Sequence, residues 1–237
     1  MPIGILVSSS AVVIGGIIGG SLGQRLPFRY KEMLPKVFGL IALAISITLI
    51  IKVQTLQAVA LSLIIGTIVG VALNIHDKVE VGVSKASVAI TKRSNPIFDA
   101  SDLDINVLTS VIVLFCASGS GIYGAMEEGF YGTSSTLLVK SILDFFTAII
   151  FGSTFGYIIA TISIPQFIIY MSLFLLSRLI LPLTNPTMLA DFSACGGLIT
   201  LGAGMNIIGL TKIKMINLLP SLIIVMLISA LWKTLLG

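Results

Sequence analysis

The sequence has 237 residues, of which 56% are hydrophobic and only 10% are charged, and its mean hydropathy is +1.11. Soluble domains carry about 25% charged residues, so this composition excludes a soluble globular fold and predicts an integral membrane protein. One histidine and two cysteines are too few for the clusters that hold haem, zinc or iron–sulfur groups, and no catalytic motif is recognisable. We therefore expect that the protein binds no cofactor and no metal and is not an enzyme. The net charge of +4 is explained by anionic lipid and requires no nucleic acid.

Apolar runs near the length that crosses a bilayer as a helix, about 20 residues, recur along the chain. In chain order they are residues 3–23, 37–51, 53–75, 105–126, 145–177, 192–211 and 215–232. The second run is short, but Lys36 and Lys52 flank it and can reach the two interfaces. The long run from 145, divided at Pro165, is read as the end of a fifth span followed by a sixth. The sequence therefore predicts eight spans.

Basic residues gather in the connections after the first, third and seventh spans. They are Arg25, Arg29, Lys31, Lys36, Lys78, Lys85, Lys92, Arg93, Lys212 and Lys214. Cytoplasmic loops carry an excess of Lys and Arg, so these connections are expected in the cytoplasm and both termini outside. The first span lacks the basic start and cleavage pattern of a signal peptide and is expected to be retained.

The segment 76–93 is amphipathic if it is helical. Its basic stripe is Lys78, Lys85 and Lys92, and its apolar stripe is Val79, Val83, Ala86 and Ile90. We expect it to lie on the inner leaflet, in contact with anionic lipid. An alternating run of three valines leaves a short strand as the alternative.

The chain also resembles itself. A shift of 104 residues, followed by a further shift of 78, superposes Gly15 on Gly119 and Gly197, and Gly20 on Gly124 and Gly202. In each copy a Gly-rich span precedes a short polar connector and a second span, which indicates an internal repeat. The same shift places the third span over the sixth, so the first two copies have three helices each and the third copy has two.

This pattern predicts an all-α polytopic membrane protein of three repeats (3+3+2), with the first two in inverted topology, as in secondary transporters. The expected parts of this single membrane domain are repeat 1 at 1–75, a cytoplasmic linker at 76–101, repeat 2 at 102–181 and repeat 3 at 182–237. Whether 182–200 spans the bilayer or is re-entrant is left open. The GxxxG pair Gly66/Gly70 suits helix packing, either within the chain or in a homo-oligomer.

Ionisable residues inside the spans are the first candidates for a site, because a charge at the bilayer centre costs roughly 2.5 to 3.5 kcal/mol on insertion scales. Lys140 and Asp144 stand four apart on the fifth span and share a helix face, and Arg178 ends the sixth. All three are expected in the outer half of the membrane, where the cations would attract an anionic solute. The alternative is that both cations are interfacial anchors and that Asp144 neutralises Lys140.

A second group of candidates lies near the inner end of the seventh span. Asn206 is close to Gly202, and a broken helix there would free backbone groups to bind a solute or ion. Gly124 and Gly20 hold the positions equivalent to Gly202 in the other copies. The alternatives are a capping or interhelical hydrogen bond for Asn206 and close helix contact for the glycines.

Three stretches carry a resemblance to a known family. They are GGLITLGAGMNIIGLTKIKMINLLPSL, CASGSGIYGAMEEGFYGTSSTLLVKSILD and the GTIVG of the third span. Together they resemble the YqgA/YdfK-like polytopic membrane proteins of bacteria over nearly the whole chain. That family tends to carry Tyr-Gln-Gly in the sixth span, where this chain has Tyr170, Met171 and Ser172. The resemblance implies a multi-pass protein of the bacterial cytoplasmic membrane and supplies no chemistry.

Two functions remain in contention. The inverted repeats and the embedded charges favour a transporter or channel for a small polar, possibly anionic, solute, working by alternating access. The alternative is a membrane scaffold or assembly partner without transport, in which the glycines are helix contacts and the charges are anchors.

Overall fold

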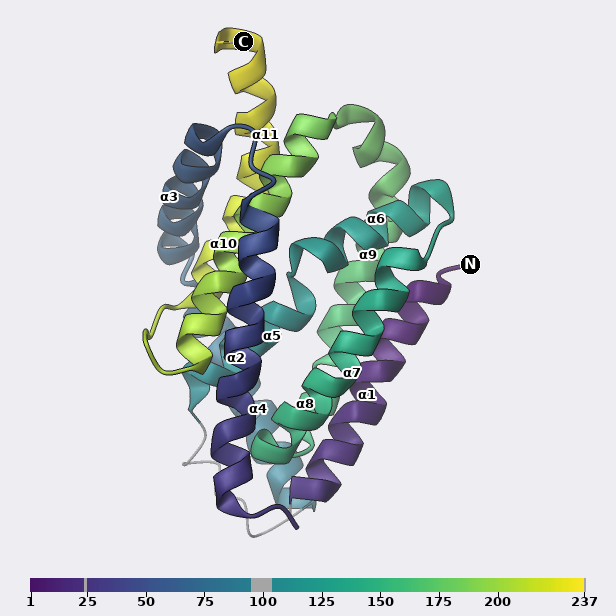
Figure 1. Ribbon diagram of the computed structural model, residues 1–237, viewed down its shortest axis with the longest axis vertical. Helices are drawn as coiled ribbons and strands as arrows, with labels where there is room; N and C mark the ends of the chain where they lie inside the picture. The colour runs from purple at the N-terminus through teal and green to yellow at the C-terminus, as the bar shows by residue number, and fades with distance from the viewer. Residues whose placement is uncertain (24, 95–103, 237) are drawn as a thin grey trace.

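The computed structural model describes residues 1–23, 25–94 and 104–236, and over these ranges the chain is helical and contains no strand (Figure 1). The helices are α1 Ile3–Gly23, α2 Phe28–Ile50, α3 Leu56–Ala72, α4 Ile75–Ser94, α5 Ile105–Cys116, α6 Gly119–Tyr131, α7 Ser135–Phe155, α8 Ile158–Thr161, α9 Ser163–Ile180, α10 Pro186–Ile207 and α11 Pro220–Leu236, with 3-10 turns at Leu181–Leu183 and Met215–Leu218. The all-α class is confirmed. The predicted boundary between linker and second repeat, at 101/102, lies outside the described residues.

The number of membrane-crossing helices agrees with the polytopic prediction. Among the described residues, seven segments are long and apolar enough to cross a bilayer, and α3 with the start of α4 makes an eighth. The fourth span, Ile105–Tyr131, consists of two helices, α5 and α6. The seventh is one unbroken helix, α10, whose start is capped by the Asn185 side chain accepting from the Met188 amide at 2.9 Å.

The turn between the fifth and sixth spans lies nine residues earlier than the predicted division at Pro165. Gly156 ends α7 with φ +74° and ψ −156°, a conformation that only glycine adopts at little cost. The single turn of α8 follows. Pro165 lies in the first turn of α9, where its missing amide hydrogen removes no helix hydrogen bond. The prediction was wrong because proline at a helix start is compatible with the helix.

The helices form two groups. On the right of Figure 1, α1, α6, α7, α8 and α9 pack together, and on the left α2, α3, α10 and α11 do so. Helix α5 contacts both groups, and α2 also touches α7. The boundary between the groups therefore runs along α2, α5, α7 and α10.

Glycines set the closest helix contact. Along α1, Gly15, Gly19 and Gly23 recur every four residues and face the main chain of α7. A Cβ atom at each would collide with a carbonyl oxygen of α7. The two backbones can approach this closely only because no side chain separates them.

The GxxxG pair of the third span is used within the chain. A Cβ at Gly66 would collide with the backbone of Ser221, and one at Gly70 with the backbone of Asn217, both at the start of the last span. These two glycines therefore pack α3 against the start of α11 and the 3-10 turn before it. A homo-oligomer stays a prediction that needs a different surface.

The amphipathic segment 76–93 lies within α4, which confirms the helical interpretation over the strand. Helix α4 bends away from α3 by 61°. Lys78 and Lys85 are exposed, while Val79 and Val83 pack against the two main hydrophobic clusters. The side chains of Ala86, Ile90 and Lys92 lie outside the described part. Contact with anionic lipid stays a prediction.

His76 anchors the start of α4. Its amide donates to Asn217 Oδ1 at 3.0 Å, its ring is buried, and its Nε2 lies 3.5 Å from Glu80 Oε2. This contact ties the start of α4 to the 3-10 turn that precedes α11.

Candidate functional site

In the described part of the chain three carboxylates are buried among the apolar helices, and two of them cap helix starts. Glu128 on α6 accepts from the amides of Gly4 at 2.7 Å and Ile5 at 3.2 Å, at the first turn of α1. Asp191 on α10 accepts from the amides of Gln54 and Thr55 at 2.9 and 2.8 Å, just before α3. A carboxylate suits these positions because a helix start carries unpaired N–H groups and a partial positive charge. Both residues therefore have a structural explanation.

The third buried carboxylate, Asp144, belongs to an ion pair. Lys140 Nζ donates to both of its oxygens, at 2.7 and 2.6 Å, and each residue is only 6% exposed. The predicted pair on one face of the fifth span is thus confirmed as a contact. It is an i, i+4 pair within α7, so it joins no two helices by itself.

Polar side chains from α1 and α9 surround the pair. Gln166 Nε2 donates to Asp144 Oδ2 at 3.0 Å and to Ser8 Oγ at 3.2 Å, and Ser8 Oγ lies 3.3 Å from the same carboxylate oxygen. Gln166 Oε1 is buried and has no hydrogen-bond partner among the described residues. Lys140 Nζ lies 5.8 Å from the centre of the Tyr170 ring. The Asp144 carboxylate therefore accepts hydrogen bonds from three side chains, those of Lys140, Gln166 and Ser8.

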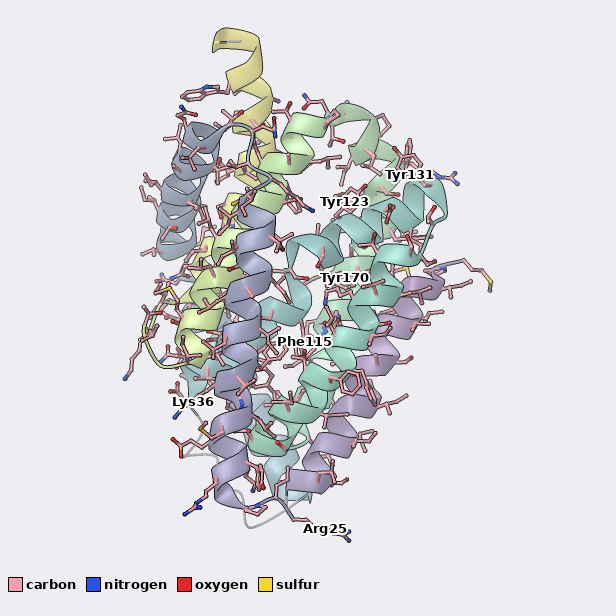
Figure 2. The ribbon with its side chains drawn as sticks, in the orientation of Figure 1. Arg25, Lys36, Phe115, Tyr123, Tyr131 and Tyr170 are labelled. Carbon is pink, nitrogen blue, oxygen red and sulfur yellow. The ribbon has the colours of Figure 1, made fainter. Side chains whose placement is uncertain are left out.

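Tyr170 links this cluster to the break in the fourth span. Its hydroxyl donates to the carbonyl of Phe115 at 2.7 Å, in the last turn of α5. Figure 2 places both residues near the middle of the long axis, with Arg25 at the lower end and Tyr131 toward the upper end. The ion pair and the helix break thus lie at the same depth of the molecule, far from both ends.

The break itself consists of Ala117 and Ser118, which separate α5 from α6. Ser118 caps α6, with its Oγ accepting from the Gly121 amide at 3.3 Å. Gly121 has no room for a side chain, because the Tyr170 hydroxyl and the Lys140 side chain occupy that space. The sequence Ser-Gly-Ser-Gly therefore serves two purposes: it starts a helix and admits the ion pair beside it.

Cavities adjoin the ion pair along the boundary between the helix groups. A cavity of about 80 Å³ has Ser118, Ser120, Lys140, Asp144, Thr147 and Thr200 as its polar lining. A cavity of about 440 Å³ shares Ser120 and Lys140 with it and extends to Ser135 and Thr136 at the start of α7. A third, of about 230 Å³, lies at the opposite end of the molecule, between Lys31 and Glu32 on α2, Asp104 before α5, and Thr154 on α7.

Aromatic rings separate the central cavity from this third one. Phe38 lines the central cavity, and its ring meets that of Phe151 edge-on, with 5.3 Å between centroids. Phe155, which lines the third cavity, lies one turn further along α7 with its centroid 6.3 Å from that of Phe151. The three rings thus form a continuous aromatic contact from the lining of the central cavity to that of the third.

The other polar candidates do not join the ion pair. Arg178 is exposed in the last turn of α9 and lines none of the three cavities. Asn206 is buried, and its amide group donates to Ser110 Oγ and to the Ile213 carbonyl, while Oδ1 accepts from Thr211 and Ile213. Asn206 therefore secures the loop after α10, which agrees with the hydrogen-bonding alternative.

The candidate glycines are packing positions. A Cβ at Gly20 would press on the Tyr157 ring, one at Gly124 on Leu137, and one at Gly202 on Met215. Helix α10 is unbroken at Gly202. These contacts agree with the alternative of close helix packing.

One group of described residues has the spacing of a metal site. Ligand atoms of His76, Asp77 and Glu80 lie within 4.8 Å of one another. Asp77, however, already pairs with Lys214 at 2.9 Å, and a resident cation would have to displace that ammonium. We assign the group no function.

Sequence reasoning missed Ser8, Gln166, Ser118 and Ser120. Gln166 was the strongest available signal, because an amide inside the apolar run 145–177 requires a protein partner. Ser118 and Ser120 carried a weaker signal, since serine is common at ordinary helix–helix contacts in membranes.

The fold and the site define a polytopic α-helical membrane protein with a buried ion pair beside a broken span. The family model described as "Protein of unknown function (DUF554)" matches residues 3–230, and the chain belongs to this family. It is 43% identical to the uncharacterized protein YqgA of Escherichia coli over 98% of both chains, and 30% identical to the uncharacterized membrane protein YdfK of Bacillus subtilis over 93% of both. No solved structure matches it.

A double substitution tests the energetics of the ion pair. Asp144→Leu leaves the Lys140 ammonium buried without its partner and should cost about 3 to 5 kcal/mol of unfolding free energy. Adding Lys140→Met removes the stranded charge, and the double variant should recover most of the lost stability. Thermal unfolding of the purified proteins in one detergent measures both. A double variant as unstable as Asp144→Leu would mean that the two side chains are not energetically coupled.

Proposed function

We propose that this protein carries a small polar solute across the bacterial cytoplasmic membrane by alternating access, with Lys140 and Asp144 beside the break between α5 and α6 as the solute site. The observation that carries this proposal is that a buried ion pair lines a cavity at the boundary between two groups of helices. Transporters bind their solutes in this kind of place, near the membrane midplane and beside an interrupted helix.

The ion pair needs a reason to be kept. Replacing a buried pair with apolar side chains is often neutral or stabilising, so the stability of the fold does not require it. The other buried carboxylates, Glu128 and Asp191, cap helices. Lys140 and Asp144 cap no helix, and although Asp144 also accepts from Ser8 of α1 and Gln166 of α9, those hydrogen bonds do not need a charge. An ionisable residue inside a membrane is by default a functional candidate.

The arrangement of cavities supports a path. The large cavity leads from Ser135 and Thr136 to Lys140, and the central cavity continues to Asp144 and Thr147. Beyond the rings of Phe38 and Phe151, the third cavity opens at the other end. In this conformation the path is closed on the side of the third cavity, as one state of an alternating-access cycle would be.

The basic residues support an orientation. Arg25 and Lys36 lie in the lower part of Figure 2, and Lys31 and Lys36 line the third cavity, which opens at the same end. By the positive-inside rule this end faces the cytoplasm, and both termini then lie outside. The two inverted repeats with a third, shorter copy are part of the same proposal.

The scaffold remains the second candidate, and one observation favours it. Gly20, Gly124, Gly202 and Asn206 all serve helix packing or loop hydrogen bonds. A scaffold needs these contacts and needs no water at the ion pair.

Cysteine labelling separates the two functions. In a background with Cys116→Ala and Cys195→Ala, Ser120→Cys lies in the shared lining of the central and large cavities. A membrane-impermeant thiol reagent added from outside should modify it. Ser141→Cys is the matched control, because Ser141 is buried beside Lys140 and lines no described cavity. An unreactive Ser120→Cys in the folded protein would favour the scaffold over the transporter.

A further inference from the structure

We propose that the transported solute is a small zwitterion, with one ammonium and one carboxylate group, such as a short amino acid. This inference rests on the proposed function and names its substrate class. It starts from the ionisable residues of the central and large cavities. Among their lining residues, Lys140 and Asp144 are the ionisable ones, and they carry one charge of each sign.

The net charge of the site decides which solute fits. A charged solute would add an uncompensated charge to a region of low dielectric constant, where an unpaired ion is strongly disfavoured. A zwitterion adds none. Its carboxylate can take the place of Asp144 on Lys140, and its ammonium can take the place of Lys140 on Asp144, so each charge keeps a partner. An uncharged solute offers no partner to either member of a separated pair.

The broken helix reinforces the positive half of this site. The amide of Ser120, in the first turn of α6, donates no hydrogen bond to the described part of the chain. Ser118 and Ser120 line the central cavity together with Lys140. A free amide and the positive end of a 13-residue helix favour a carboxylate at this position.

Hydroxyl groups reinforce the negative half. Thr147 Oγ1 donates its hydrogen to the Leu143 carbonyl at 2.6 Å, and Thr200 Oγ1 donates to the Gly196 carbonyl at 2.8 Å. Each hydroxyl has only one hydrogen, so both present acceptor lone pairs to the cavity that they share with Asp144. Acceptors around a carboxylate suit an ammonium group.

The cavity sizes limit the solute. The central cavity, of about 80 Å³, is smaller than the cavity of about 150 Å³ that holds benzene in an engineered protein. It therefore admits the charged head of a short amino acid and little more. A small side group would extend into the larger cavity, where Ile45, Val139 and Leu143 supply an apolar wall.

Binding measurements on the full-length protein in lipid nanodiscs test the substrate class. The probes are glycine, L-alanine and L-valine as zwitterions, acetate and methylammonium as the separate charged halves, and acetamide as an uncharged polar analogue. We expect at least one zwitterion to raise the thermal unfolding midpoint in a saturable manner. Acetate, methylammonium and acetamide should bind at least tenfold more weakly.

Two variants link the effect to the site. Lys140→Met with Asp144→Leu should abolish the effect of the zwitterion. Thr200→Val should weaken it severalfold, and this variant carries the test if the double variant does not fold. The matched control is Lys214→Met with Asp77→Leu, which removes a Lys–Asp pair of similar geometry, 2.9 Å long and more than half exposed, and should leave binding unchanged.

Each of the following outcomes would overturn the proposal that the substrate is a zwitterion. If acetate, methylammonium or acetamide binds best and the Lys140/Asp144 double variant abolishes that binding, the site stands and the substrate class is wrong. If no probe binds while Ser120→Cys reacts from outside, the class is wrong and the accessible path stands. If Ser120→Cys is unreactive as well, the proposed function falls together with this inference.

Discussion

A polar group in hydrocarbon must find its partner within the protein, because no water is available to replace it. This constraint decides where the buried carboxylates of this protein lie. Glu128 and Asp191 take up the unpaired amides at the starts of two helices, and Asp144 takes up the ammonium of Lys140. Each cap closes one group of helices: Glu128 joins α6 to α1, and Asp191 joins α10 to α3. The helix groups are therefore secured separately, and the boundary between them does not depend on either cap.

Helix α5 is the element that both groups hold by hydrogen bonds. Ser110 near its middle accepts from Asn206 of α10, and the Phe115 carbonyl near its end accepts from Tyr170 of α9. The helix then breaks at Ala117 and Ser118, and α6 continues within the group that contains α7 and α9. A displacement of one group against the other would strain these two hydrogen bonds and the two-residue break. Helices α1 and α7, which belong to one group, would move together and keep their glycine contacts.

Much of the fold could be predicted from sequence because the bilayer imposes long apolar runs. The contact between Lys140 and Asp144 could be predicted too, since a spacing of four fixes a common helix face. The contributions of Ser8 and Gln166 could not, because they reach Asp144 from spans that are distant in the chain. The helix break was also beyond prediction. Gly119 and Gly121 adjoin a break, whereas Gly15 and Gly16 lie in an unbroken helix against close neighbours, and glycine content alone does not distinguish the two cases.

The two helix caps also bear on how the protein is made. The amide of Gly4 pairs with the Glu128 carboxylate, which is synthesised 124 residues later, and the amide of Gln54 pairs with that of Asp191, 137 residues later. At roughly 5 to 20 residues per second, the first delay lasts about 6 to 25 seconds. During that interval the ribosome has released α1 and α3 without the groups that finish their first turns. The N-terminal third of the chain can therefore enter the bilayer early but reaches its final packing only after α6 and α10 have been synthesised.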